Sequence, residues 1–86
     1  MDLEETTVVN TKSIVNENTR KELISIFEDL KERGYEAEKQ IVAYLASGDP
    51  GYISSYKECR SRISKFNRED IIEIMLNNFI NLKWFI

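Results

Sequence analysis

Carboxylates are the most numerous side chains in this sequence that could do chemistry. The 86 residues include 15 Asp and Glu against 12 Lys and Arg, and there is no histidine. The sequence therefore lacks the commonest general base and the commonest transition-metal ligand. We expect the carboxylates on helix exteriors, where they aid solubility and capping, so no catalytic residue and no enzyme activity is predicted. Those weighed for acid–base work are Glu28, Asp29, Glu32, Glu69, Asp70 and Glu73.

Cys59 is the lone cysteine. One thiol cannot form an internal disulfide, and a cysteine-based zinc site would lack its other ligands. We expect Cys59 to pack as a small hydrophobic residue on a helix face. Neither a metal nor a cofactor is predicted, and a reducing compartment fits this cysteine usage.

Basic side chains gather between residues 57 and 68. A helix, a turn and a second, basic helix also describe a DNA-reading motif, which is the alternative function. Against it stand the net charge of -3 and a connection from residue 47 to 55 that is longer than the usual turn. We therefore expect a solvated basic face that contacts an anion or a protein partner, and not nucleic acid. The predicted contact residues are Arg60, Arg62, Lys65 and Arg68.

Two threonines, Thr6 and Thr7, follow Glu4 and Glu5 in a polar segment without sustained periodicity. A kinase active site could reach such a segment, and phosphate would add about -1.5 to -2 units of charge near neutral pH. The residues alone favour an ordinary polar tail. We expect residues 1–18 to form a flexible N-terminal arm and residues 19–86 a helical domain.

The secondary structure that carries these residues is predicted to be four main helices with a short turn, so the fold is expected to be all-α. The first helix is expected to begin near Asn18 or Thr19, where Glu22 would complete a capping box, and to end at Gly34. The second spans residues 36–47, a short helical turn follows through Tyr52, and the third spans residues 55–66.

The fourth helix, predicted to follow Asn67, has the widest apolar face in the sequence. That face is too wide for one small domain to cover, and a small domain leaves much apolar surface wet. We therefore predict a homodimer. Its predicted interface residues are Ile72, Met75, Leu76, Phe79 and Ile80.

The first residues are acidic and lack the pattern of a signal peptide, and no apolar run approaches the roughly 20 residues of a membrane span. A cytoplasmic protein without membrane contact is expected.

Three segments of the middle of the chain resemble a known family, the IreB regulatory phosphoproteins. They are Gly34-Tyr35, the run from Gln40 to Leu45, and the run from Ser47 to Ile53, in which Ser-Gly-Asp-Pro is the specific part. The similarity extends from about residue 23 to 75. The C-terminal Trp84-Phe85-Ile86 departs from the polar tail of that family.

This resemblance implies a small helical protein that dimerises and is a substrate of a membrane-anchored Ser/Thr kinase that senses the cell wall. The regulatory threonines of the family lie in the N-terminal arm, and an ungapped alignment places Thr6 and Thr7 there. The resemblance therefore reverses the reading of these threonines as an ordinary tail. It names no downstream protein partner and no sign for the regulation.

Overall fold

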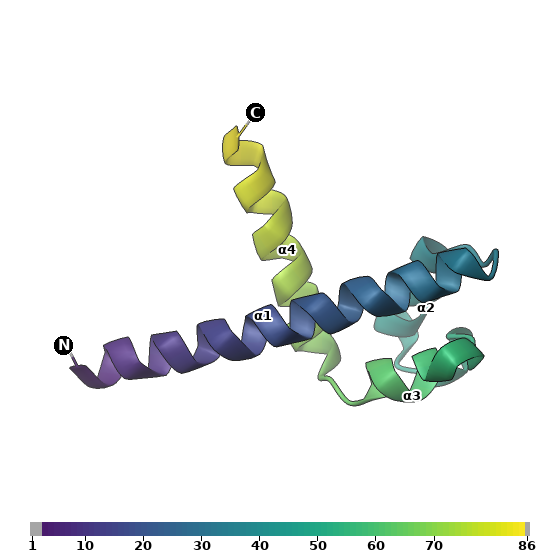
Figure 1. Ribbon diagram of the computed structural model, residues 1–86, viewed down its shortest axis with the longest axis horizontal. Coiled ribbons are helices and arrows are strands. Elements are labelled where there is room, and N and C mark those ends of the chain that lie inside the picture. The colour runs from purple at the N-terminus through teal and green to yellow at the C-terminus, as the bar shows by residue number, and fades with distance from the viewer. Residues whose placement is uncertain (1–2, 86) are drawn as a thin grey trace.

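The computed structural model describes the backbone of residues 3–85 and the side chains of residues 17–81, and every regular element in it is helical (Figure 1). The elements in chain order are α1 (Leu3–Glu32), α2 (Ala37–Ser47), the 3-10 turns η1 (Pro50–Tyr52) and η2 (Tyr56–Glu58), α3 (Cys59–Ser64) and α4 (Arg68–Phe85). The predicted all-α fold of four helices is confirmed.

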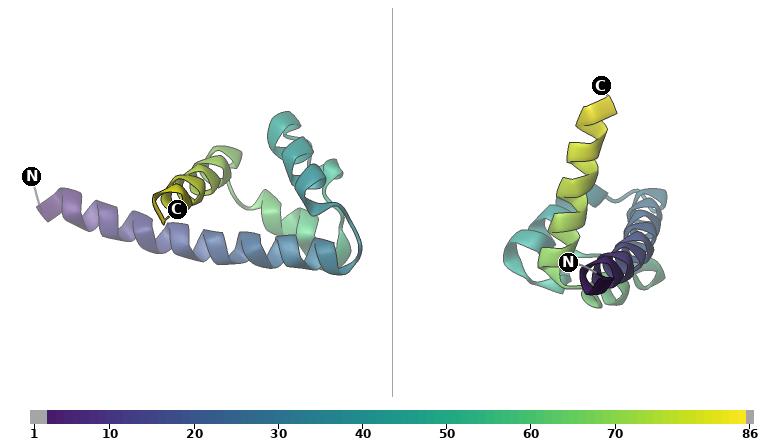
Figure 2. Two further views of the ribbon diagram at one scale, coloured as in Figure 1. Left: turned by 90° about the horizontal axis from the view of Figure 1, so that it is seen from above. Right: turned by 90° about the vertical axis from the view of Figure 1, so that its left-hand side faces the viewer.

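The long helix α1 is the base on which the other elements are arranged. The elements α2 and α3 lie beside its C-terminal half, and α4 rises steeply from its middle (Figures 1 and 2). The predicted start of this helix near Asn18 or Thr19 was wrong, because α1 begins at Leu3 and Thr19 is a buried residue within it. No glycine or proline interrupts the chain before Gly34, so nothing ends the helix between these points. The boundary at residue 18 between arm and domain stays a prediction.

The core forms where one face of each helix meets α1. Leu23, Ile26 and Leu30 project from α1 at intervals of three and four residues, and all three are buried. Burial of side chains of this size contributes about 1.5 to 3 kcal/mol each, which holds the short elements on α1. The residues that complete the cluster are Ala37, Ile41, Tyr44, Ile53, Cys59, Ile63 and Ile71.

Left-handed glycines end the first two helical segments, as predicted. Gly34 and Gly48 have φ angles of +97° and +82°, which residues with a Cβ atom adopt only with strain. After Gly48, the Asp49 side chain accepts a hydrogen bond from the Gly51 backbone at 2.9 Å and caps η1. The Ser-Gly-Asp-Pro segment therefore forms a tight corner between two helices.

The expected third helix, residues 55–66, is divided in the structure. Lys57 and Glu58 both have left-handed backbone angles, with φ values of 50° and 63°, so η2 ends there and α3 begins at Cys59. Left-handed geometry costs roughly 1 to 2 kcal/mol per residue outside glycine. The turn must therefore be held by contacts elsewhere.

A double-mutant experiment tests how the corner is built. A Cβ atom on Gly48 would lie 2.9 Å from the Arg68 Cζ atom, whereas one on Gly34 would meet nothing. We expect Gly34→Ala to lower the free energy of unfolding by about 1 kcal/mol through strain alone. Gly48→Ala should cost about 1 kcal/mol more, because the Arg68 side chain must move and give up its hydrogen bond to the Leu45 carbonyl. In an Arg68→Ala background this excess should vanish. Urea unfolding measures all of these values, and an unchanged excess would contradict the role of Arg68.

Candidate interaction surfaces

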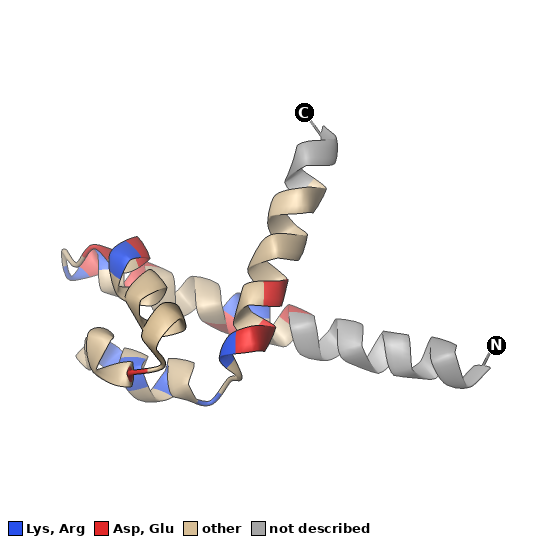
Figure 3. Cartoon of the chain, turned by 180° about the vertical axis from the view of Figure 1, so that it is seen from behind, with Lys and Arg blue, Asp and Glu red and all other residues tan. Residues whose placement is uncertain are grey.

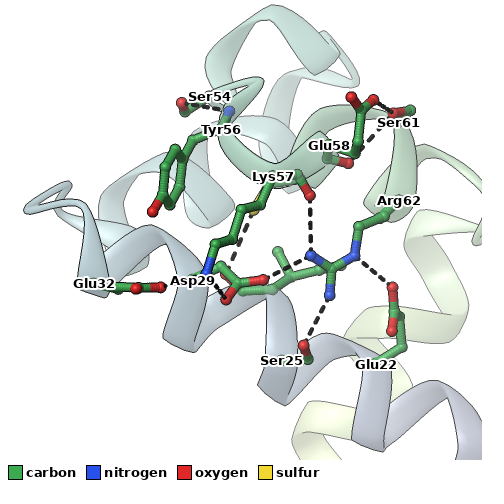
Figure 4. Close-up of polar contacts among 12 residues, drawn as sticks. Glu22, Ser25, Asp29, Glu32, Ser54, Tyr56, Lys57, Glu58, Ser61 and Arg62 are labelled. Carbon is green, nitrogen blue, oxygen red and sulfur yellow. Dashed lines mark hydrogen bonds and ion pairs between the residues drawn. The ribbon is translucent and has the colours of Figure 1, made fainter.

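Arg62 on α3 lies at the centre of the densest polar network in the described part of the chain (Figure 4). Its Nε donates to a Glu22 carboxylate oxygen at 2.7 Å and its Nη1 to an Asp29 oxygen at 2.7 Å. Its Nη2 donates to the Ser25 hydroxyl at 2.8 Å. Since these partners are all on α1, one guanidinium ties α3 to the long helix.

The same guanidinium also holds the left-handed turn. Arg62 Nη1 donates to the Lys57 carbonyl at 3.2 Å, and Lys57 Nζ lies 2.9 Å from a Glu32 oxygen and 3.8 Å from an Asp29 oxygen. The hydrogen bond to Glu32 raises the pKa of Lys57, and the bonds to Glu22 and Asp29 raise that of Arg62. Both cations stay charged at neutral pH. The turn is therefore held to α1 by the Lys57 side chain and to α3 by the bond from Arg62 to the Lys57 carbonyl.

The other predicted basic residues point to separate places. Arg60 Nε donates to the Ile53 carbonyl at 2.8 Å, and Arg68 Nη1 donates to the Leu45 carbonyl near the end of α2 at 2.9 Å. Lys65 is exposed, and its side chain pairs with no residue in the range 17–81. Arg60 and Lys65 are exposed, whereas Arg62 turns inward toward α1. The structure gives the DNA-reading alternative no support, because the guanidiniums do not converge on one groove-reading face.

The carboxylates weighed for catalysis do not form an active site in the described residues. Asp29 pairs with Arg62 and Lys57, and Glu32 with Lys57, while Glu28, Glu69 and Glu73 are exposed. No group of three or more His, Cys, Asp or Glu in this region is arranged to hold a metal ion. Cys59 is buried, and burial raises the pKa of its thiol, as a packing role requires.

The apolar face of α4 divides between the core and solvent. Ile71 and Ile74 are buried, whereas the five residues predicted for a dimer interface are exposed, from 40% for Ile72 and Met75 to 68% for Phe79. Among residues 68–81 of α4, the charged residues are Arg68, Glu69, Asp70 and Glu73, which all lie within its first two turns (Figure 3). In the described residues no helix is both long and apolar enough to cross a bilayer. The exposed face of α4 is thus a contiguous apolar surface of the kind that marks an interaction site.

A groove of about 410 Å3 between α1 and α4 was not predicted. Its walls are mostly apolar, and Arg20 Nε donates to the Asn78 side chain at 3.0 Å across one end. The sequence contained one sign of an apolar surface here. Ile24 lies outside the buried stripe of α1, and no role was predicted for it. The groove is lined by Arg20, Leu23, Ile24, Phe27, Glu28, Ile41, Ile74, Met75 and Asn78.

The predicted phosphorylation sites Thr6 and Thr7 lie outside the residues whose side chains are described. Residues 4–81 match the family model described as IreB regulatory phosphoprotein, a range that includes both threonines.

Removal of the Arg62 guanidinium should destabilise the whole fold. Arg62→Met keeps much of the stem but leaves Glu22 and Asp29 unpaired, and we expect a loss of about 2 kcal/mol in the free energy of unfolding because the network is only partly exposed to water. Lys65→Met is the matched control and should change stability by less than about 0.5 kcal/mol. Equal urea midpoints for the two variants would contradict a structural role for Arg62.

Proposed function

The chain belongs to the IreB regulatory phosphoprotein family, and from that membership we propose that it is a substrate of a membrane-anchored Ser/Thr kinase that senses the cell wall. That family is one of regulatory phosphoproteins and not of enzymes. In this proposal the protein acts in the cytoplasm by contacts with other proteins, and phosphate is placed on Thr6 or Thr7. The observation that carries it is the family match over residues 4–81, which includes both threonines.

We further propose that the protein acts as a homodimer, with the exposed face of α4 in the interface. This face presents Leu76, Phe79 and Ile80 to solvent at 54%, 68% and 47% exposure. Apolar side chains that project together from one helix gain about 25 cal/mol for each Å2 that a partner covers. A second copy of the same helix offers the matching apolar face without any other protein being needed.

The basic residues left on the surface are proposed to contact the phosphorylated arm or an acidic partner. The side chains of Arg60 and Arg68 each donate one hydrogen bond, and the Lys65 side chain donates none within residues 17–81. Their remaining donors suit phosphate oxygens. Arg62 is the least suited of the predicted set, because its three nitrogens already bind α1 and Lys57.

Phosphorylation is tested with the cognate kinase and mass spectrometry. We expect one phosphate per chain on the peptide that contains Thr6 and Thr7, and none on a Thr6→Ala/Thr7→Ala variant. Thr11 and Thr19 serve as internal controls, since each is a threonine outside the acidic pair. Phosphate only at other positions, or none at all, would remove the proposed regulation.

The dimer is tested by light scattering coupled to gel filtration at micromolar concentration. We expect a dimer for the wild type and a monomer for Leu76→Glu/Phe79→Glu, because two buried carboxylates per chain would strongly oppose association. Val42→Glu is the matched control, since Val42 is also exposed, at 63%, but lies on α2. A monomeric wild type, or a double variant that stays dimeric, would contradict the proposed interface.

A further inference from the structure

The exposed side of α1 carries a charge pattern that the core and the Arg62 network do not use. At 100° per residue, Glu17, Arg20, Ile24, Glu28 and Lys31 fall within roughly 80° of one another around the helix axis, so they form one stripe. All five are exposed. The stripe extends for about 21 Å along the helix at 1.5 Å per residue.

The order of charges along this stripe is complementary to itself when reversed. From the N-terminal end it reads acidic, basic, apolar, acidic, basic, with Ile24 in the middle. In an antiparallel copy related by a twofold axis through Ile24, Arg20 lies opposite Glu28 and Glu17 lies opposite Lys31. Residues that face each other across such an axis have numbers that add to 48, and both charge pairs meet that condition.

We propose that a second copy of the chain packs antiparallel along this stripe, with Ile24 on the twofold axis and Arg20 paired with the Glu28 of the second copy. This inference rests on the proposed homodimer and specifies its geometry. A twofold interface presents the same patch from both subunits, so every contact is made twice. A single surface stripe therefore supplies four charge pairs.

The charged ends of the stripe are available for such pairing. Arg20 uses only Nε in its bond to Asn78, which leaves both terminal nitrogens to donate. Glu17 and Glu28 make no ion pair or side-chain hydrogen bond with another residue in the range 17–81. Lys31 lies 3.3 Å from Glu38 in an exposed pair and contacts the Phe27 ring, so the outer pair with Glu17 is the weaker of the two.

The groove supplies the apolar part of the contact. Ile24, Phe27 and Met75 line it from α1 and α4, and Ile24 is 42% exposed. Met75 also belongs to the exposed face of α4, so the groove and that face are continuous. An occupant that covers the stripe on α1 therefore meets the apolar surface of α4 at its edge, and one interface uses both.

The charge order favours a second copy over an unrelated helix. A partner from another protein would need acidic and basic residues at matching positions along about four helical turns, whereas this chain already carries the required complement. Charge pairs of this kind fix the direction and register of a helix pair more than its affinity. The apolar contacts supply the affinity, and the charges select the antiparallel orientation.

Disulfide trapping tests the position of the axis. Ile24→Cys brings two thiols together only if Ile24 lies next to its own copy, since a disulfide needs Cα atoms within about 7 Å. Val42→Cys is the matched control, an exposed apolar residue on α2, and both variants retain the buried Cys59. Under mild oxidation we expect a covalent dimer for Ile24→Cys at least about tenfold faster than for Val42→Cys or the wild type. Equal rates would overturn the proposal.

A charge-reversal cycle tests the pairing independently. Arg20→Glu and Glu28→Arg should each raise the dimer Kd about tenfold at low salt, because each places like charges opposite one another twice, and the effect should shrink at high salt. The double variant should return to within about threefold of the wild type. Asn78→Ala controls for the lost Arg20 bond and should leave Kd nearly unchanged.

The outcomes separate the geometry from the homodimer itself. A wild type that dimerises, with single variants that match its Kd or a double variant that is not rescued, would overturn the α1 pairing and leave the proposed homodimer in place. A monomeric wild type would remove both. The phosphate assignment to Thr6 or Thr7 is independent of either result.

Discussion

The Arg62 guanidinium is the interaction on which the arrangement of these helices depends. The six-residue helix α3 is too short to be stable alone, because helices below about 12 residues are marginal in water. Two apolar side chains, Cys59 and Ile63, bury α3 in the core, and Arg62 adds bonds to Glu22, Asp29 and Ser25 that fix its position on α1. The left-handed Lys57 and Glu58 just before it store strain that these bonds and the Lys57 pair with Glu32 offset.

This network also decides which surfaces are left for partners. It uses the inner carboxylates of α1, so the stripe from Glu17 to Lys31 on the other side of that helix keeps its charges exposed. It withdraws Arg62 from the basic face, which leaves Arg60, Lys65 and Arg68 on separate surfaces. One of the four basic residues predicted to contact a partner, Arg62, is therefore used inside the fold. The surface suited to a large partner is the exposed apolar face of α4.

Local signals in the sequence predicted much of the fold. Gly34 and Gly48 marked helix ends correctly, the short helical turn expected through Tyr52 is η1, and the all-α class was predicted. The start of α1 and the break at Lys57 were missed for different reasons. Asn18 and Thr19 are good caps that a continuous helix can also accommodate, and neither Lys57 nor Glu58 is a residue type that signals left-handed backbone. The Arg62 network joins residues 33 to 40 positions apart, and no short motif encodes that distance.

The helix α4 shows why the surface residues were easier to predict than their geometry. Its apolar positions are so numerous that Ile71 and Ile74 suffice for the core, and Ile72, Met75, Leu76, Phe79 and Ile80 remain outside it. An excess of apolar residues can be counted in a sequence, and it implies a partner. An excess of apolar residues does not specify how the partner is oriented, however, because the hydrophobic effect is non-directional. The orientation of a partner helix is set by an ordered row of charges. In this chain that row lies on α1, across the groove from α4, and its reversed order is complementary to a second copy of the same helix.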